Sequence, residues 1–123
     1  MEKTFLLIGA AAGFLAVALG AFGAHALRAR LSADMLDVFE TGVRYQMYHA
    51  IAILIVGLIA ARLDGWLIRT AGWCFTAGIV LFSGSLYALA VTGIRPLGAI
   101  TPLGGVCFLA GWIALVVGVL KQN

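Results

Sequence analysis

Charged side chains are scarce in this chain of 123 residues. Lys, Arg, Asp and Glu together make up 11% of it, about half the share of a typical soluble domain. Hydrophobic residues reach 63% and the mean hydropathy is +1.10. This composition excludes an ordinary soluble domain and indicates an integral membrane protein in contact with membrane lipid. The net charge of +3 is spread along the chain, without the dense basic stripe that nucleic-acid binding requires. We therefore expect no nucleic-acid partner.

Cysteines and catalytic motifs are also scarce. The chain has two cysteines, Cys74 and Cys107, and neither belongs to a CxxC or zinc-ligand pattern. We expect them to lie at different depths in the membrane, as small packing residues without a disulfide. The sequence contains no nucleophile elbow, no HExxH and no phosphate-binding glycine loop. It therefore predicts no catalytic residue, no metal and no cofactor, and hence a protein that is not an enzyme.

Long apolar runs dominate what is present. They predict a single transmembrane domain, 1–123, with spans at about 4–24, at 42–61 within a longer helix 33–61, at 66–91 and at 103–120. Each run is close to the roughly 20 residues that one crossing needs. Every backbone group must be satisfied inside a bilayer, and the runs lack the alternation of barrel strands. Short connections force antiparallel neighbours. The sequence predicts an all-α, integral membrane four-helix bundle.

The orientation of the bundle is weakly encoded. The first run follows Lys3 and ends in an A-x-A-like pattern at residues 24–26, but it is too long for a signal peptide and is interpreted as a retained helix. Lys and Arg divide four against four between the two membrane sides, so the positive-inside rule does not decide. Discounting Arg44, because it lies within a helix, favours cytoplasmic termini.

Glycine is abundant, with 16 residues. Small residues allow helices to approach closely in lipid, where association gains little from the hydrophobic effect. The glycines predicted to serve helix packing are Gly9, Gly13, Gly20, Gly104 and Gly105. Most of them are expected to pack inside the bundle. The alternative is an interface to a homo-oligomer or a larger membrane complex.

Polar residues gather around the start of the second long helix. Ser32 and Asp34 have a structural explanation, because a hydroxyl cap and a carboxylate stabilise a helix N-terminus. The remaining candidate polar cluster comprises His25, Arg28, Asp37, Glu40, Arg44, Tyr45, Tyr48 and His49. Within it, Glu40 and Arg44 have the i, i+4 spacing of an ion pair. That pair is either structural or functional, and the sequence leaves both possibilities open.

The cluster does not occupy one helix face. Asp37, Arg44 and Tyr48 share a face, whereas His49 lies on a neighbouring one, where it makes a core hydrogen bond or accepts a proton. The possible partners across the bundle are Ser83, Ser85, Tyr87 and Arg95. Thr101 is expected to cap the last helix, with Pro102 in its first position.

Several motifs together resemble a known family. They are residues 20–27 (GAFGAHAL), 39–50 (FETGVRYQMYHA) and 100–105 (ITPLGG), followed by Gly111 and Trp112. The chain resembles the small bacterial membrane proteins of the YgdD and YwdK type, catalogued as domain of unknown function 423, and transmembrane protein 256 of eukaryotes looks related. The resemblance implies a four-helix protein of the bacterial inner (plasma) membrane, and it implies no activity.

Three functional hypotheses follow, in order of preference. The first is a non-enzymatic bundle that associates with itself or with a larger membrane complex. The second is a transporter of a small solute or proton, with a path lined by Glu40, Arg44, Tyr48 and His49. The third is a membrane enzyme or cofactor carrier that uses His25 and His49.

Overall fold

The structure, a computed structural model, describes residues 1–63 and 65–122. All regular elements in this part of the chain are helical. In chain order they are α1 (Glu2–Val17), the π-helical turn η1 (Ala18–Gly23), α2 (Ala24–Leu27), α3 (Ala33–Ala60), α4 (Trp66–Gly78), the π-helical turn η2 (Ile79–Ser83), α5 (Gly84–Thr92), the 3-10 turn η3 (Arg95–Ala99) and α6 (Thr101–Leu120).

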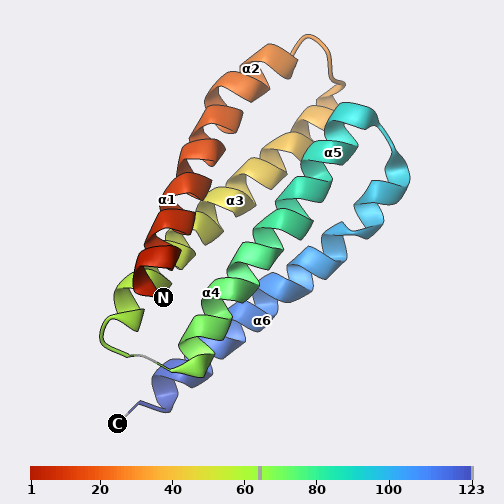
Figure 1. The fold of residues 1–123 in the computed structure, drawn as a ribbon. Coiled ribbons are helices and arrows are strands. Elements are labelled where there is room, and N and C mark those ends of the chain that lie inside the picture. Colours follow the sequence, from red (N-terminus) through yellow and green to blue (C-terminus); the bar gives the residue numbers. More distant parts are fainter. Residues whose placement is uncertain (64, 123) are drawn as a thin grey trace.

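These elements form four long helices, each apolar and long enough to cross a membrane. They are Glu2–Leu27, Ala33–Ala60, Trp66–Thr92 and Arg95–Leu120, and we call them helices 1 to 4. Consecutive helices run antiparallel, so both termini lie at one end of the bundle (Figure 1). We call this end the terminal side, and the opposite end, with residues 28–32 and 93–94, the loop side. The predicted all-α four-helix membrane fold is confirmed.

The helix ends follow local rules with one exception. The Ser32 hydroxyl accepts from the backbone N–H of Met35 at 3.2 Å and caps α3 as expected. Gly93, with φ of 70°, ends α5 in the left-handed conformation that glycine adopts without strain. Thr101 is not the predicted cap, because it is the first residue of α6 and its side chain makes no capping bond. Its hydroxyl lies 2.6 Å from that of Ser85 instead.

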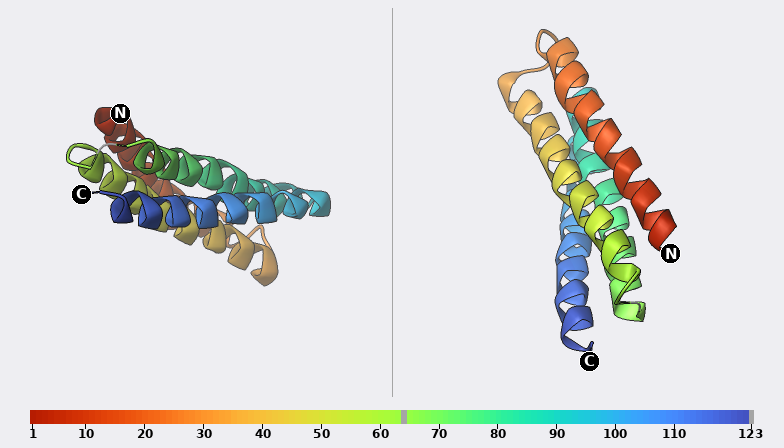
Figure 2. Two further views of the ribbon diagram at one scale, coloured as in Figure 1. Left: turned by 90° about the horizontal axis from the view of Figure 1, so that it is seen from below. Right: turned by 90° about the vertical axis from the view of Figure 1, so that its left-hand side faces the viewer.

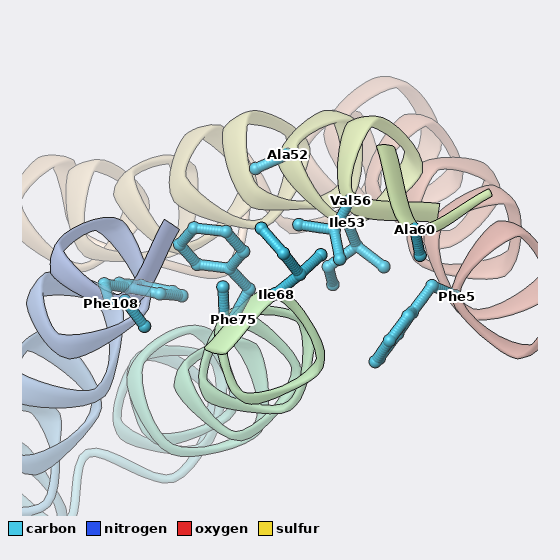
Figure 3. Packing of buried hydrophobic residues seen from close by; sticks show 10 residues of the cluster. Phe5, Ala52, Ile53, Val56, Ala60, Ile68, Phe75 and Phe108 are labelled. Carbon is cyan, nitrogen blue, oxygen red and sulfur yellow. The ribbon is translucent and has the colours of Figure 1, made fainter. Parts of the chain in front are cut away.

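The main apolar core lies towards the terminal side, where the first three helices converge (Figure 3). Phe5 from α1, Ile53 and Val56 from α3, and Ile68 and Phe75 from α4 are fully shielded. Phe108 of α6 closes the cluster from the fourth helix (Figure 3). A smaller cluster of Ala24, Phe39 and Ala90 lies near the loop side. Dispersion between such side chains is a main source of helix association in lipid.

Helix 1 lies at the edge of the bundle. It packs mainly against α3, while α6 packs mainly against α4 (Figure 2). Near the terminal side Phe5 fills the space over Gly72, and its ring centroid is 5.2 Å from that of Trp73. This contact joins helix 1 to helix 3 near their terminal-side ends.

The five glycines predicted to serve packing differ in their surroundings. A Cβ atom at Gly9 would lie 2.8 Å from Leu54 Cγ, and one at Gly20 would lie 2.9 Å from Val43 Cγ1. One at Gly104 would overlap the backbone of Phe82. These three glycines therefore permit close helix packing. Gly13 and Gly105 have no atom within 4 Å of such a Cβ.

The two neighbouring glycines of α6 provide a matched pair for testing this packing. We expect Gly104→Ala to lower the free energy of unfolding by about 1–3 kcal/mol, because the methyl group would force α6 away from the Phe82 backbone. Gly105→Ala should be neutral or slightly stabilising, since it meets open space and favours the helix. Denaturation in detergent, followed by circular dichroism, measures both. Equal stability of the two variants would contradict the close contact.

Candidate functional site

A buried glutamine connects three of the four helices. Gln46 of α3 is 4% exposed. Its Nε2 donates to the carbonyl of Ala12 in α1 at 2.8 Å, and its Oε1 accepts from the hydroxyl of Tyr87 in α5 at 2.6 Å. A buried amide in hydrocarbon is costly unless it is bonded. Gln46 therefore fixes helices 1 and 3 against helix 2.

Two serines of helix 3 extend these polar connections. The fully buried Ser83 donates to the carbonyl of Gly42 in α3 at 2.7 Å. Ser85 points towards helix 4, where its hydroxyl pairs with that of Thr101. Both were predicted as cross-bundle partners, and the structure places them, with Tyr87, in contact with neighbouring helices.

His49 of α3 packs against α6. It is 5% exposed, and its ring stacks on Phe108 with a centroid distance of 3.6 Å and an interplanar angle of 7°. Its Nε2 accepts from Trp112 Nε1 at 3.1 Å, and its Nδ1 lies 2.8 Å from the Tyr45 carbonyl. Because an indole nitrogen only donates, His49 Nε2 carries no proton. The imidazole is therefore neutral, and Nδ1 donates to Tyr45.

These hydrogen bonds engage the polar side chains of the interior. In residues 1–63 and 65–122, every buried side-chain nitrogen and oxygen has a hydrogen-bond partner. The same residues contain no group of three His, Cys, Asp or Glu side chains that could hold a metal ion. Cys74 and Cys107 are free thiols, as expected. The site is a set of structural hydrogen bonds around the middle of α3.

The charged residues of the predicted cluster lie outside this set. Arg44 is exposed, and its Nη2 donates to the Thr41 hydroxyl at 3.2 Å. No ion pair with Glu40 forms between these two described residues, although their spacing predicts one. The physical reason is that exposed ion pairs gain little over solvation and lose side-chain entropy. Tyr48 is 55% exposed, on the same outward face as Arg44.

The remaining members of the predicted cluster do not converge either. His25, Arg28, Asp37 and Arg95 are exposed on the loop side. His25 follows Ala24, which packs with Phe39, whereas His49 lies ten residues further along α3, about 15 Å away along the axis. Tyr45 is partly exposed and partly packed. Its ring centroid lies 4.7 Å from that of Phe82, although 38% of the residue is exposed.

Sequence reasoning missed Gln46 and Trp112 as site residues. A signal for Gln46 was present, because Gly42, Gln46, His49 and Ile53 recur at the spacing of one helix face. A lone amide on an otherwise apolar face requires a partner. Trp112 offered no local signal. Its donation to His49 depends on the relative positions of α3 and α6.

A groove lies beside Gln46, between helices 1 and 3. Its volume is about 520 Å³. One wall is formed by Ile8, Ala11, Ala12, Leu15 and Leu19. The opposite wall is formed by Thr76, Ile79, Val80, Gly84 and Tyr87. Among the described residues, Gln46 is the one residue of α3 that lines it, and its hydrogen-bond partner Tyr87 lines it as well. On helix 1 its lining begins at Ile8, three residues beyond Phe5.

These features define a multi-spanning helical membrane protein with a bonded interior and a groove on one side. A family model described as "Protein of unknown function (DUF423)" matches residues 19–105. The chain is 53% identical over 120 residues to the UPF0382 membrane protein YwdK of Bacillus subtilis, covering 97% of this chain and 98% of the relative. A UPF0382 membrane protein of Staphylococcus saprophyticus is 49% identical over 119 residues, covering 97% and 98%.

The chain therefore belongs to the DUF423 family of membrane proteins, which confirms the resemblance drawn from its motifs. No solved structure matches the chain.

The histidine geometry generates a direct spectroscopic prediction. Nitrogen chemical shifts of the two histidines should show His49 as the neutral Nδ1–H form, with Nε2 as an acceptor. Trp112→Phe should lower the free energy of unfolding by about 1 kcal/mol, because it removes an interhelical hydrogen bond, and it should alter the Nε2 shift. The exposed His25 is the internal control. Observation of an Nε2–H form for His49 would rule out the assigned tautomer.

The outward position of Arg44 also gives a stability prediction. Because no ion pair with Glu40 forms, Glu40→Gln and Arg44→Gln should each change the free energy of unfolding by less than about 0.5 kcal/mol. The change in the free energy of unfolding of the double variant should equal the sum of the two single changes. Denaturation midpoints in detergent measure all three. A loss above about 2 kcal/mol in either single variant would show that the pair is structural after all.

Proposed function

We propose that this protein is a non-enzymatic bundle that acts by association within the membrane, through the groove between helices 1 and 3. The observation that carries the proposal is this groove of about 520 Å³. In a closed bundle, side chains of adjacent helices would fill such a space. Here Ala11, Ala12 and Gly84 are small and leave it open to another membrane component.

The bonded interior supports a non-catalytic role. Gln46, Ser83 and His49 hold neighbouring helices together, and their polar atoms are engaged in that task. A hydrolase or transferase needs an activated nucleophile or a general base within reach of a substrate. In the described part of the chain, the buried polar groups are engaged in structural bonds instead.

The geometry favours association over transport. A path for a solute or proton would require Glu40, Arg44, Tyr48 and His49 to line one channel. Arg44 and Tyr48 instead lie on the exposed face of α3, and His49 is enclosed by Phe108 and Trp112 on another face. We therefore retain the association hypothesis and propose no transport path.

The proposal extends to cellular placement. We place the bundle in the bacterial plasma membrane with its termini in the cytoplasm, as the charge distribution without Arg44 favours. The component that occupies the groove is then a lipid, a second copy of the chain or a subunit of a larger membrane complex.

Two glycines allow the groove to be tested without disturbing the core. Gly84 lines the groove, whereas Gly105 does not, and a Cβ at either position meets no atom within 4 Å. Gly84→Leu should fill part of the groove and reduce the co-purifying component at least tenfold, with Gly105→Leu as the matched control. Native mass spectrometry of protein extracted gently from its own membrane measures bound lipids, subunit number and partner chains together.

Circular dichroism confirms that both variants remain folded before binding is compared. If every bound component remains at the same level in Gly84→Leu and in the native protein, the groove is not the association surface. If Gly105→Leu alone causes the loss, association takes place on α6 instead.

A further inference from the structure

The level of the loop-side membrane edge can be derived from hydrogen bonds between the helices. Helix α6 has 20 residues, Thr101–Leu120, which is about 30 Å at 1.5 Å per residue, the thickness of the hydrocarbon core. Thr101 therefore lies at the loop-side edge, and Ser85, whose hydroxyl pairs with that of Thr101, lies at the same level. Ser83 precedes Ser85 by two residues, about 3 Å deeper along the helix, and its hydroxyl donates to the Gly42 carbonyl. Gly42 of α3 thus lies about 3 Å inside this edge.

This level places the Arg44 guanidinium at the boundary between headgroups and hydrocarbon. Its Cα lies two residues beyond Gly42, but the side chain turns back towards the loop side, where Nη2 donates to the Thr41 hydroxyl at 3.2 Å. Thr41 is one residue nearer the edge than Gly42. The rest of α3 agrees with this depth, because residues 45–61 carry no charged side chain, a length of about 26 Å at 1.5 Å per residue. The guanidinium therefore lies where the phosphates of lipids begin.

The outward face of α3 carries its charges in a fixed order from the hydrocarbon to the water. Glu40 and Asp37 lie four and seven residues nearer the loop side than Arg44, separations that place all three on one helix face. The acidic side chains tilt towards the helix N-terminus, which is the loop side, so their carboxylates extend into the headgroup region. In the opposite direction the face continues with Tyr48 and Ile51, which are 55% and 50% exposed. The order is apolar side chains, a cation and then two anions.

No ion pair within the described chain neutralises these charges. In residues 1–63 and 65–122, Arg44 makes one side-chain hydrogen bond, to Thr41, and neither Arg44 nor the two acidic residues forms a salt bridge. A guanidinium has five N–H groups, so most of its donors remain available. Charges near the hydrocarbon interact more strongly than in bulk water, because the dielectric constant falls. An external group with complementary charges is therefore favoured on this face.

The order of the charges selects one class of lipid headgroup. In phosphatidylethanolamine the phosphate lies next to the glycerol, and the primary ammonium group lies beyond it on a short ethylene link. This headgroup presents an anion at the membrane edge and a cation outside it, which is the complement of Arg44 followed by Glu40 and Asp37. Phosphatidylglycerol would meet the arginine but would gain nothing from the carboxylates. A choline headgroup has both charges, but its ammonium has no N–H to donate.

We infer that the outward face of α3 binds one phosphatidylethanolamine molecule of the loop-side leaflet. Arg44 donates to the phosphate, and the carboxylates of Glu40 and Asp37 accept from the ammonium group. An acyl chain of the same lipid follows Tyr48 into the bilayer. Arg44 lies two residues before Gln46, about 200° around the helix. The lipid site is therefore separate from the groove between helices 1 and 3, and it goes beyond the association proposed for that groove.

The test uses the full chain, purified in mild detergent and stripped of bound lipid. Phosphatidylethanolamine, phosphatidylglycerol and phosphatidylcholine with identical acyl chains are added in equal amounts, and native mass spectrometry measures the lipids bound per chain. We expect one phosphatidylethanolamine, bound about three- to fivefold more tightly than either of the others, as exposed charge pairs predict. Arg44→Gln should weaken its binding about tenfold, because charge-assisted bonds to the phosphate are lost. Arg95→Gln, at an exposed arginine outside α3, should match the native protein.

Removal of the acidic charges tests the selectivity itself. Asp37→Asn combined with Glu40→Gln should abolish the preference for phosphatidylethanolamine, and phosphatidylglycerol should then bind at least as tightly, because no carboxylate repels its phosphate. Circular dichroism verifies that each variant is folded before binding is compared. Gly84→Leu changes the groove and leaves this face of α3 intact, so it should bind phosphatidylethanolamine as the native protein does.

The contrary outcomes overturn the inference separately from the proposed function. Equal binding of phosphatidylethanolamine and phosphatidylcholine would show that the carboxylates do not accept from the ammonium group. Tighter binding of phosphatidylglycerol by the native protein would show that attraction to the arginine alone governs the site. Unchanged binding in Arg44→Gln would place the lipid elsewhere. If Gly84→Leu loses the lipid and Arg44→Gln does not, the lipid occupies the groove, which overturns this site and supports the proposed function.

Discussion

The amide of Gln46 is the interaction on which the arrangement of helices 1, 2 and 3 depends. In lipid, apolar faces gain little by leaving the solvent, so close packing and interhelical hydrogen bonds position the helices. Gln46 bonds to Ala12 on one side and Tyr87 on the other. A bond of this kind contributes about 0.6–2 kcal/mol in a membrane, and leaving the amide unbonded would cost more. The same residue that fixes helix 1 also faces the groove beside it.

Elsewhere in the bundle, hydrogen bonds of polar residues and close packing at glycines also hold the helices together. Ser83 and His49 tie α3 to helices 3 and 4, while Gly104 brings α6 against the Phe82 backbone. Helix 1 has fewer such contacts with helix 3, because Phe5 is near its start and small alanines follow. The result is a bundle that is tight between helices 3 and 4 and open between helices 1 and 3. We propose this asymmetry as the physical basis for association in the membrane.

The charged residues near the loop side have a simpler explanation than the sequence suggested. Arg44 bonds to Thr41 one turn nearer the membrane edge, as expected for a side chain that tilts towards the helix N-terminus. The side chain therefore extends towards the loop side, without an ion pair to Glu40. Asp34 lies in the first turn of α3, where an acidic side chain stabilises the helix N-terminus, whereas Asp37 and Glu40 lie beyond that turn. The family relationship adds no activity to these residues, because its members are described as membrane proteins of unknown function.

The sequence by itself determined the four membrane-length helices, their antiparallel order and the Ser32 cap, because hydrocarbon thickness and local hydrogen bonds act along the chain. It also indicated that Ser83, Ser85 and Tyr87 would meet other helices. Only the tertiary structure decided that Gln46 and Trp112 are the partners that matter, that Thr101 pairs with Ser85, and that Arg44 faces outward. These outcomes depend on the rotation of each helix about its axis. That rotation is set by packing between residues far apart in the chain, which no local pattern encodes.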